Sequence, residues 1–195
     1  MKRFISFEGI DGSGKSTISK LVYKKLKSNG YDAVHTFEPT NSEIGIQVQK
    51  YIKENADPFV TSFTFIADRI LHGKQITKWL KEGKIVICDR YAESTYAYQG
   101  AQLQDAVDKP IKWLQGISKN KIPIPDRTFL FVINPEISLS RIQNREQLIP
   151  FEKVSFLKKV QKNYLDLLVD KRFFKIDATK KMEEIIKICY DDIIS

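Results

Sequence analysis

The sequence contains little cysteine and little histidine, with two residues of each among 195. Cys88 and Cys189 lie far apart without the partner spacing of a zinc site, and two cysteines do not make a disulfide framework. We therefore expect both thiols to be reduced and packed in the interior. We expect no chemical role for His35 and His72.

Long apolar runs are also missing, and none approaches the roughly 20 residues that cross a bilayer. The basic start at Lys2 and Arg3 leads into an apolar stretch that breaks at Glu8, with no cleavage site of small residues. The sequence therefore predicts neither a membrane segment nor a targeting signal, and we expect a cytoplasmic protein. Because repeats, low-complexity tracts and linkers are absent too, we expect residues 1–195 to form a single domain.

The chain lacks an acidic balance, since its formal net charge is +8. Such a charge suits nucleic acids, anionic surfaces or small anionic substrates. The lysines are spread along the whole chain, which is typical of a solvated surface. We therefore expect a small anionic partner and neither nucleic acid nor membrane.

Short apolar runs alternate with amphipathic stretches along the chain. Strands are expected at 4–7, 32–37, 84–88, 128–133 and 173–176, and helices at 16–28, 59–81 and 180–193. Continuous apolar strands separated by helices predict an α/β fold, a three-layer sandwich with a five-stranded parallel sheet and helices on both faces. Ligands of such sheets bind beyond the carboxyl ends of the strands.

The first predicted strand is followed by the P-loop pattern Gly-x4-Gly-Lys-Ser at 9–16. Its glycines let backbone N–H groups face phosphate oxygens, its lysine reaches the β- and γ-phosphates, and its serine hydroxyl binds Mg²⁺. The pattern predicts a nucleoside-triphosphate site in a P-loop NTPase fold. The predicted nucleotide-binding residues of the loop are Gly9, Asp11, Gly12, Ser13, Gly14, Lys15, Ser16 and Thr17.

Asp89 and Arg90 follow the third predicted strand directly. A carboxylate at that place can hold Mg²⁺ together with Ser16, and an arginine can clamp a transferring phosphoryl group. The alternative is a strand-end carboxylate that only pairs with its neighbour.

An acceptor site is suggested by Phe65 and Arg69, which lie four residues apart on one helix face. A phenyl ring beside a guanidinium suits a mononucleotide, although the spacing alone favours a core phenylalanine and a surface arginine. The polar and aromatic stretch at 94–100 could add hydrogen bonds to a base and a ring against a sugar.

Together these motifs resemble thymidylate kinases over nearly the whole chain. The matching stretches are FEGIDGSGKST at 7–17, FEP at 37–39, FIADR at 65–69, DRY at 89–91, Ser94 and AYQG at 97–100. The resemblance implies transfer of the γ-phosphate of ATP to dTMP, giving ADP and dTDP, with Mg²⁺ as a cofactor. It also implies a homodimer.

The resemblance implies a role at each matching position. Phe65 would stack on thymine, Thr95 would face its edge, and Arg69 would bind the dTMP phosphate. Asp11 would lie near the 3′-hydroxyl, and Tyr98 would occupy the place of a ribose 2′-hydroxyl. The implied substrate-binding residues are Asp11, Glu38, Pro39, Phe65, Arg69, Arg90, Ser94, Thr95, Tyr98 and Gln99.

The resemblance further implies an arginine-rich lid over the ATP phosphates at roughly 141–153. Arg141 and Ala178 would lie near adenine, and the implied catalytic residues are Lys15, Arg90, Asp11 and Arg145. The chain departs from the family pattern at Phe37, where an arginine is usual, and near Pro150, where a compensating lid arginine is expected. Slow turnover, or an acceptor other than dTMP alone, would follow from a missing cation.

Two other functions stay open from the sequence. One is a kinase for another pyrimidine monophosphate, such as dUMP or UMP/CMP. The other is a P-loop ATPase or switch that binds a macromolecule, which only the net charge supports.

Overall fold

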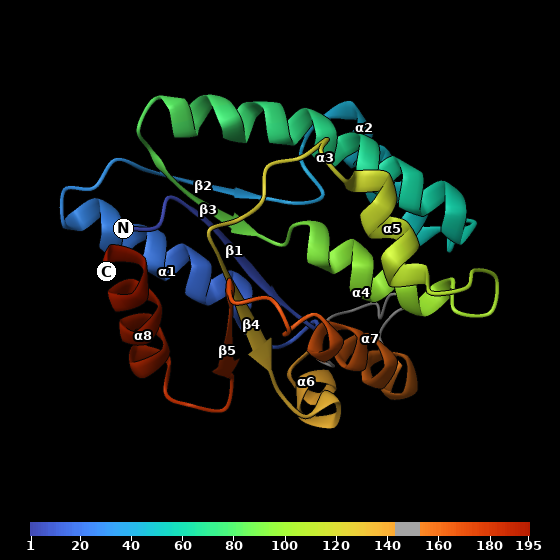
Figure 1. The fold of residues 1–195 in the computed structure, drawn as a ribbon. Helices are drawn as coiled ribbons and strands as arrows, with labels where there is room; N and C mark the ends of the chain where they lie inside the picture. Colours follow the sequence, from blue (N-terminus) through green and yellow to red (C-terminus); the bar gives the residue numbers. More distant parts are fainter. Residues whose placement is uncertain (143–152) are drawn as a thin grey trace.

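Residues 1–142 and 153–195 are described by the structure, a computed structural model (Figure 1). Within these residues, five parallel strands form one sheet in the order β2-β3-β1-β4-β5. The strands are β1 (Phe4–Gly9), β2 (Ala33–Phe37), β3 (Ile85–Asp89), β4 (Arg127–Val132) and β5 (Phe173–Asp177). The predicted five-stranded parallel sheet is confirmed.

Helices cover both faces of this sheet, as predicted. Figure 1 shows α1 and α8 on one face and α3, α4, α5 and α7 on the other. The bounds are α1 (Lys15–Ser28), α2 (Glu43–Lys53), α3 (Pro58–Lys81), α4 (Ala92–Gln102), α5 (Pro110–Ser118), α6 (Pro135–Ile142), α7 (Val154–Asp166) and α8 (Met182–Ile194). The short α2 packs against α3.

The central strand β1 serves both helical layers because its side chains alternate between the two faces. Ile5 and Phe7 belong to a core cluster with residues of α1 and α8. Phe4 belongs to a second cluster with residues of α3 and α5. Both faces of β1 are thus buried, which explains why apolar residues dominate this stretch of the sequence.

The long helix α3 begins and ends at signals that the sequence carries. The Asp57 carboxylate accepts hydrogen bonds from the N–H groups of Phe59 and Val60, and Pro58 is the first helical residue. Gly83, which follows the C-cap, has a φ of 82°. The helix predicted at 59–81 is therefore confirmed within one residue.

The sequence did not predict several of the helices, and α4 shows why. Residues 92–101 of α4 are all buried, so it has no exposed polar face and no apolar stripe at helical spacing. It lies between β1, α3, α5 and α7 and carries the stretch that was singled out for the acceptor site.

Both cysteines are free and buried, as expected from their scarcity. Burial raises the pKa of the Cys88 thiol well above its ordinary value. In the part of the chain that the structure describes, no helix combines the length and the apolar character needed to cross a membrane.

Candidate active site

The P-loop joins the carboxyl end of β1 to the N-terminus of α1. Gly12 and Gly14 have φ angles of 78° and 86°, in the left-handed region that glycine tolerates. No side chain caps α1, which leaves its first N–H groups available to an anion. The Ser13 hydroxyl is buried and has no hydrogen-bond partner among the described residues. The loop therefore has the form of a phosphate cradle.

Gly12 also allows α6 to approach the loop closely. A Cβ at this position would overlap the carbonyl oxygen of Ser138, whose hydroxyl donates to the carbonyl oxygen of Asp11. This contact ties the P-loop to the helix that carries Arg141.

Three charged side chains meet beside the loop. One Asp11 carboxylate oxygen lies 2.6 Å from Arg90 Nη2 and 4.0 Å from Lys15 Nζ. Burial would raise the pKa of Asp11, but the two cations outweigh burial and hold it below its ordinary value. Burial and the neighbouring Arg90 lower the pKa of Lys15 to about 8. An anionic phosphate would relieve the crowding of the two cations.

Arg90 reaches this position through an unusual backbone conformation. Its φ is 67°, which is rare outside glycine and is a form of strain found at functional sites. Its N–H donates to the carbonyl of Phe7 at 3.0 Å, and its Nη1 donates to the Ser94 hydroxyl at 3.0 Å. The guanidinium is thus fixed on the β1 side of the site.

Asp89 lies at the end of β3, beside β1 as expected. Its Oδ1 is buried and has no hydrogen-bond partner among the described residues. Within those residues no cluster of three or more acidic, histidine or cysteine side chains could hold a metal. A metal here would therefore rely on few protein ligands, which is usual for Mg²⁺ bound with nucleotide phosphates.

A buried carboxylate, Glu8, supports the same region from β1. Its Oε1 accepts from the Tyr91 N–H at 2.7 Å, and its Oε2 accepts from the hydroxyls of Ser94 at 2.7 Å and Tyr164 at 2.9 Å. Burial, reinforced by the nearby Glu93, raises the pKa of Glu8 to about 8. Since Ser94 also accepts from Arg90, Glu8 contributes indirectly to the placement of the guanidinium.

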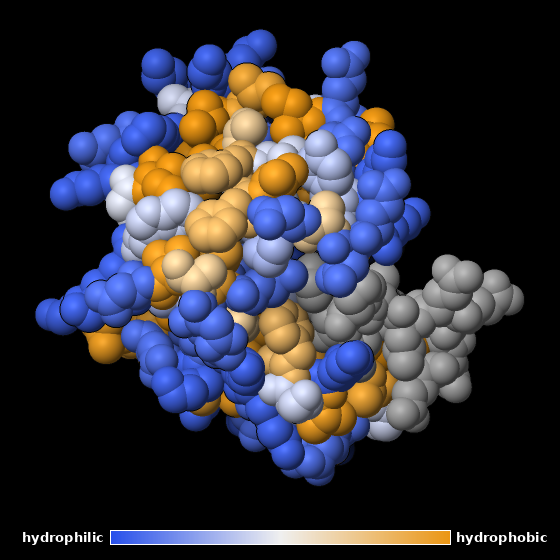
Figure 2. Space-filling view, turned by 90° about the vertical axis from the view of Figure 1, so that its right-hand side faces the viewer, coloured by the Kyte–Doolittle hydropathy of each residue, from blue (hydrophilic) through white to orange (hydrophobic). Residues whose placement is uncertain are grey.

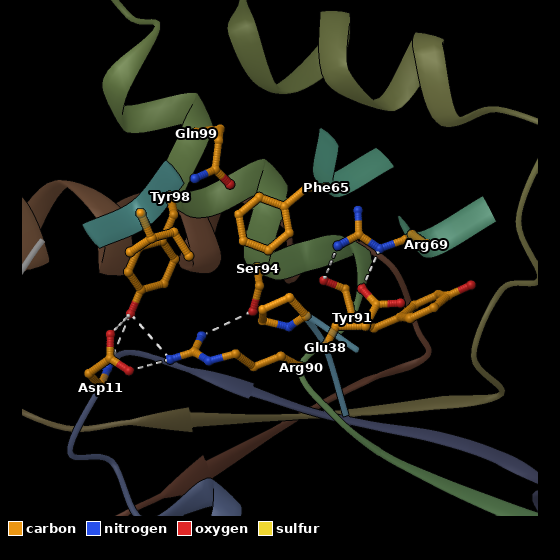
Figure 3. A pocket seen from close by; sticks show the side chains of 11 residues that line it. Asp11, Glu38, Phe65, Arg69, Arg90, Tyr91, Ser94, Tyr98 and Gln99 are labelled. Carbon is orange, nitrogen blue, oxygen red and sulfur yellow. Dashed lines mark hydrogen bonds and ion pairs between the residues drawn. The ribbon is translucent and has the colours of Figure 1, made fainter. Parts of the chain in front are cut away.

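A cavity of about 110 Å³ opens beside Asp11 and Arg90 (Figure 3). It is lined by Asp11, Glu38, Pro39, Ile52, Phe65, Arg69, Arg90, Tyr91, Ser94, Tyr98 and Gln99. Nine of the ten residues predicted to bind substrate are among them. The structure therefore brings together residues from the P-loop, the segment after β2, α2, α3 and α4 that are far apart in sequence.

The exception is Thr95, which is fully buried behind Arg69 and does not line the cavity. Its hydroxyl accepts a hydrogen bond of 2.9 Å from Arg69 Nη2. Arg69 Nε donates to Glu38 at 2.7 Å, while Nη1 is buried with no hydrogen-bond partner among the described residues. Burial would lower the pKa of Arg69, but the Glu38 carboxylate outweighs it and raises the pKa.

Figure 3 shows Arg69 and Asp11 at opposite ends of the cavity, with Phe65 between them. At the Asp11 end, the Tyr98 hydroxyl donates to Asp11 Oδ2 at 2.7 Å and accepts from the Asp11 N–H at 3.1 Å. These contacts attach α4 to the P-loop and place the Tyr98 ring against the cavity.

The two residues expected near adenine also lie together. Arg141 Nη1 donates to the carbonyl of Ala178 at 3.5 Å, and the Ala178 N–H donates to the carbonyl of Val132 at the end of β4. Arg145, Pro150 and most of the expected lid lie outside the described residues.

Sequence reasoning missed Ile52 and Tyr91 as cavity residues and Glu8 as a supporting one. Ile52 is on α2, for which no helix was predicted. The signal for Glu8 was a carboxylate inside an apolar strand, because a buried acidic residue requires hydrogen-bonding partners.

Comparison with known proteins identifies relatives over almost the whole chain. Residues 7–187 match a family model described as "Thymidylate kinase". A protein of Methanosarcina barkeri named "Probable thymidylate kinase" is 41% identical over 189 residues, covering 95% of this chain and 92% of its own. Proteins of the same name from Sulfurisphaera tokodaii and Methanocaldococcus jannaschii are 40% and 41% identical, covering 95% and 93% of this chain and 92% and 89% of their own.

The raised pKa of Glu8 predicts a pH-dependent stability. The folded protein keeps the Glu8 proton up to about pH 8, whereas the unfolded chain loses it near the ordinary value of 4.5. The stability associated with this proton is complete below pH 4.5 and is lost as the pH rises to 8. We expect Glu8→Gln, which stays neutral, to become more stable relative to the wild type between pH 6 and pH 9.

Urea unfolding of both proteins at pH 6, 7.5 and 9 measures this difference. Glu54→Gln, at an exposed glutamate, serves as the control and should show a constant difference from the wild type. A pH-independent difference for Glu8→Gln would contradict the prediction.

Proposed function

The chain belongs to the thymidylate kinase family, and we propose that it transfers the γ-phosphate of ATP to dTMP, giving ADP and dTDP. The observation that carries the proposal is the junction between the P-loop and the aromatic cavity. Asp11 belongs to the loop and lines the cavity, and Arg90 lies between the two. A donor phosphate on the loop would thus face an acceptor in the cavity.

The donor side rests on the P-loop. Backbone N–H groups at the start of α1 and the ammonium of Lys15 would bind the β- and γ-phosphates. The Ser16 hydroxyl and Asp89 Oδ1, which has no hydrogen-bond partner in the described part of the chain, would hold Mg²⁺, which neutralises phosphate charge when bound. We place adenine near Arg141 and Ala178, beyond the ends of β4 and β5.

For the acceptor, the central position of Phe65 supports stacking on the base (Figure 3). Asp11 and Tyr98 would face the sugar, with the tyrosine ring filling the space of a 2′-hydroxyl and thereby favouring deoxyribose. Glu38, Pro39, Ser94 and Gln99 complete the walls of the cavity.

The geometry favours a different role for Arg69 from the one implied by the family resemblance. Arg69 contacts Thr95 and lies away from Asp11 and Arg90, so we assign it to the base and not to the phosphate. Its Nη1, which has no hydrogen-bond partner among the described residues, is a donor suited to the O4 carbonyl of thymine. Cytosine carries an amine at the same ring position. Thr95 then acts on the base only through Arg69.

In the reaction, a phosphate oxygen of dTMP would attack the γ-phosphorus in line with the leaving oxygen. Such a transfer requires positioning and charge neutralisation more than acid–base chemistry. Arg90 would bridge donor and acceptor phosphates, because its fixed fork suits two phosphate oxygens better than a lysine would. We also propose Arg145 as a lid residue acting on the phosphates, a role that lies outside the described residues.

The apolar surface supports a homodimer. Figure 2 shows apolar side chains gathered over one face, the side where α3 begins and α5 lies. Exposed apolar residues of α2 and α3 include Ile46, Val60 and Phe63, with exposed fractions of 58%, 44% and 50%. We call these three the α2–α3 patch; pairing it with its copy about a twofold axis would remove it from water.

The cytoplasmic location stays a prediction.

An acceptor screen tests the proposed activity. The protein is incubated with ATP and Mg²⁺ and separately with dTMP, dUMP, UMP, CMP, AMP and GMP, and ADP and each diphosphate are measured. We expect preferential formation of dTDP, matched one to one with ADP. Preference for another pyrimidine would show that the cavity binds a different acceptor from dTMP. ADP without a diphosphate would indicate an ATPase.

The bridging role of Arg90 predicts a loss of turnover on its removal. We expect Arg90→Ala to lower kcat by at least about a hundredfold, since it removes a charge that acts on the transferring phosphoryl group. Arg3→Ala, at an exposed arginine before β1 and at the opposite edge of the sheet, is the control. A near-normal kcat in folded Arg90→Ala would remove this residue from the mechanism.

The homodimer predicts that a charge in the patch separates the subunits. We expect Phe63→Glu to shift the protein from dimer to monomer in sedimentation equilibrium, because the carboxylate would be buried at the interface. Val169→Glu places the same charge on a side chain that is 92% exposed and outside the patch, and should leave the dimer intact. A wild type that is monomeric at micromolar concentration would refute the dimer.

A further inference from the structure

His72 lies one helical turn after Arg69 on α3 and is buried at the back of the cavity. Its Nδ1 lies 2.9 Å from Glu38 Oε1, and its Nε2 lies 2.7 Å from the Thr36 hydroxyl. The imidazole therefore attaches α3 both to β2, through Thr36, and to Glu38, which follows β2. Neither nitrogen faces the cavity, and His72 does not line it.

The two oxygens of Glu38 serve different partners. Oε1 contacts His72, and Oε2 accepts from Arg69 Nε at 2.7 Å. Arg69 Nη2 is left to donate to the Tyr91 carbonyl at 3.2 Å and to Thr95 at 2.9 Å. Glu38 follows β2, Tyr91 precedes α4 and Thr95 lies on α4, and together they fix the plane of the guanidinium.

Arg69 would have another arrangement if Oε1 were released. A carboxylate pairs with a guanidinium most strongly through two parallel hydrogen bonds, and here Glu38 makes only one. A freed Oε1 would compete for Nη2, because an unsatisfied buried acceptor is costly, and the guanidinium would turn away from Thr95. Holding Oε1 on His72 prevents this rearrangement.

We propose that His72 is a positioning residue for acceptor recognition. Through Glu38 it sets the orientation of Arg69 and thereby keeps Nη1 directed toward the base. Thr36 completes the chain by fixing the ring at Nε2. The inference rests on the proposed function, in which Arg69 binds a carbonyl of the base.

The imidazole is suited to this task because its two nitrogens reach partners on opposite sides. Asparagine places an amide donor close to the position of Nδ1, so it can keep the bond to Glu38. Glutamine places its donor nearer the position of Nε2 and cannot replace that bond from the same backbone position. Leucine fills similar space without any donor.

The test compares His72→Leu, His72→Asn and His72→Gln with dTMP and dCMP as acceptors. We expect His72→Leu and His72→Gln to raise KM for dTMP by about tenfold or more and to leave KM for ATP unchanged. The ratio of kcat/KM for dTMP to that for dCMP should fall by about the same factor, because a misplaced Arg69 no longer distinguishes a carbonyl from an amine. His72→Asn should restore both values to near those of the wild type.

His35→Leu is the matched control, since its histidine is also in the β2 region but contacts Ser19 of α1 at 3.0 Å. Thermal unfolding shows whether each variant is folded; if His72→Leu is not, the asparagine and glutamine variants decide. An unchanged acceptor ratio in folded His72→Gln, or equal behaviour of the asparagine and glutamine variants, would refute the positioning role. A wild type that forms no dTDP would refute the proposed function itself, which separates the two failures.

Discussion

The parallel pairing of β1 with β3 is the constraint on which the site depends. It sets Phe7 opposite Asp89, so the residues that follow the two strands emerge side by side at one edge of the sheet. The chain then continues on one side into the P-loop and on the other through Arg90 into α4. The ion pair between Asp11 and Arg90, at 2.6 Å, joins the P-loop to the segment between β3 and α4. A donor site and an acceptor site can share a boundary only because of this pairing.

Helix α4 is the common wall of the site, and its complete burial follows from that position. Side chains on different sides of the helix contact different partners: Ser94 contacts Arg90 and Glu8, Thr95 contacts Arg69, and Tyr98 contacts Asp11. A helix with such partners on several sides cannot have a solvent face. The same arrangement transmits a shift of α4 to both ends of the cavity at once.

Two buried polar networks flank this helix, one around Glu8 and one around Glu38. Both surround a buried carboxyl group with several hydrogen bonds, as buried polar groups require, and burial raises the pKa of Glu8 to about 8. They differ in their cations: Arg69 pairs with Glu38 directly, whereas Arg90 reaches Glu8 through the Ser94 hydroxyl. Arg90 is instead ion-paired with Asp11 at 2.6 Å and lies near a second cation, Lys15, whose pKa is lowered by burial and by Arg90. In the proposed function, the two cations Lys15 and Arg90 would suit a phosphate, whereas Arg69, paired with Glu38, would suit an uncharged base.

Phe37 stands where the family pattern has an arginine, which changes the positive charge near the P-loop. The ring is 40% exposed at the end of β2, opposite Asp89. A phenyl ring cannot neutralise phosphate, so Lys15 and Arg90 are the buried or half-buried cations beside the P-loop in the described part of the chain. In the proposed reaction, the acceptor phosphate would therefore depend on these two cations more strongly than it would with a third cation in place.

The sequence by itself determined the five strands and the phosphate loop, because these depend on local patterns of apolar residues, glycines and short motifs. Its resemblance to thymidylate kinases pointed to nine of the cavity residues. Only the tertiary structure decided that Thr95 lies behind Arg69, that Glu8 supports Arg90, and that His72 contacts Glu38. These contacts join residues between 26 and 86 positions apart. No local pattern encodes them, since they arise where packed elements bring buried polar groups within reach of one another.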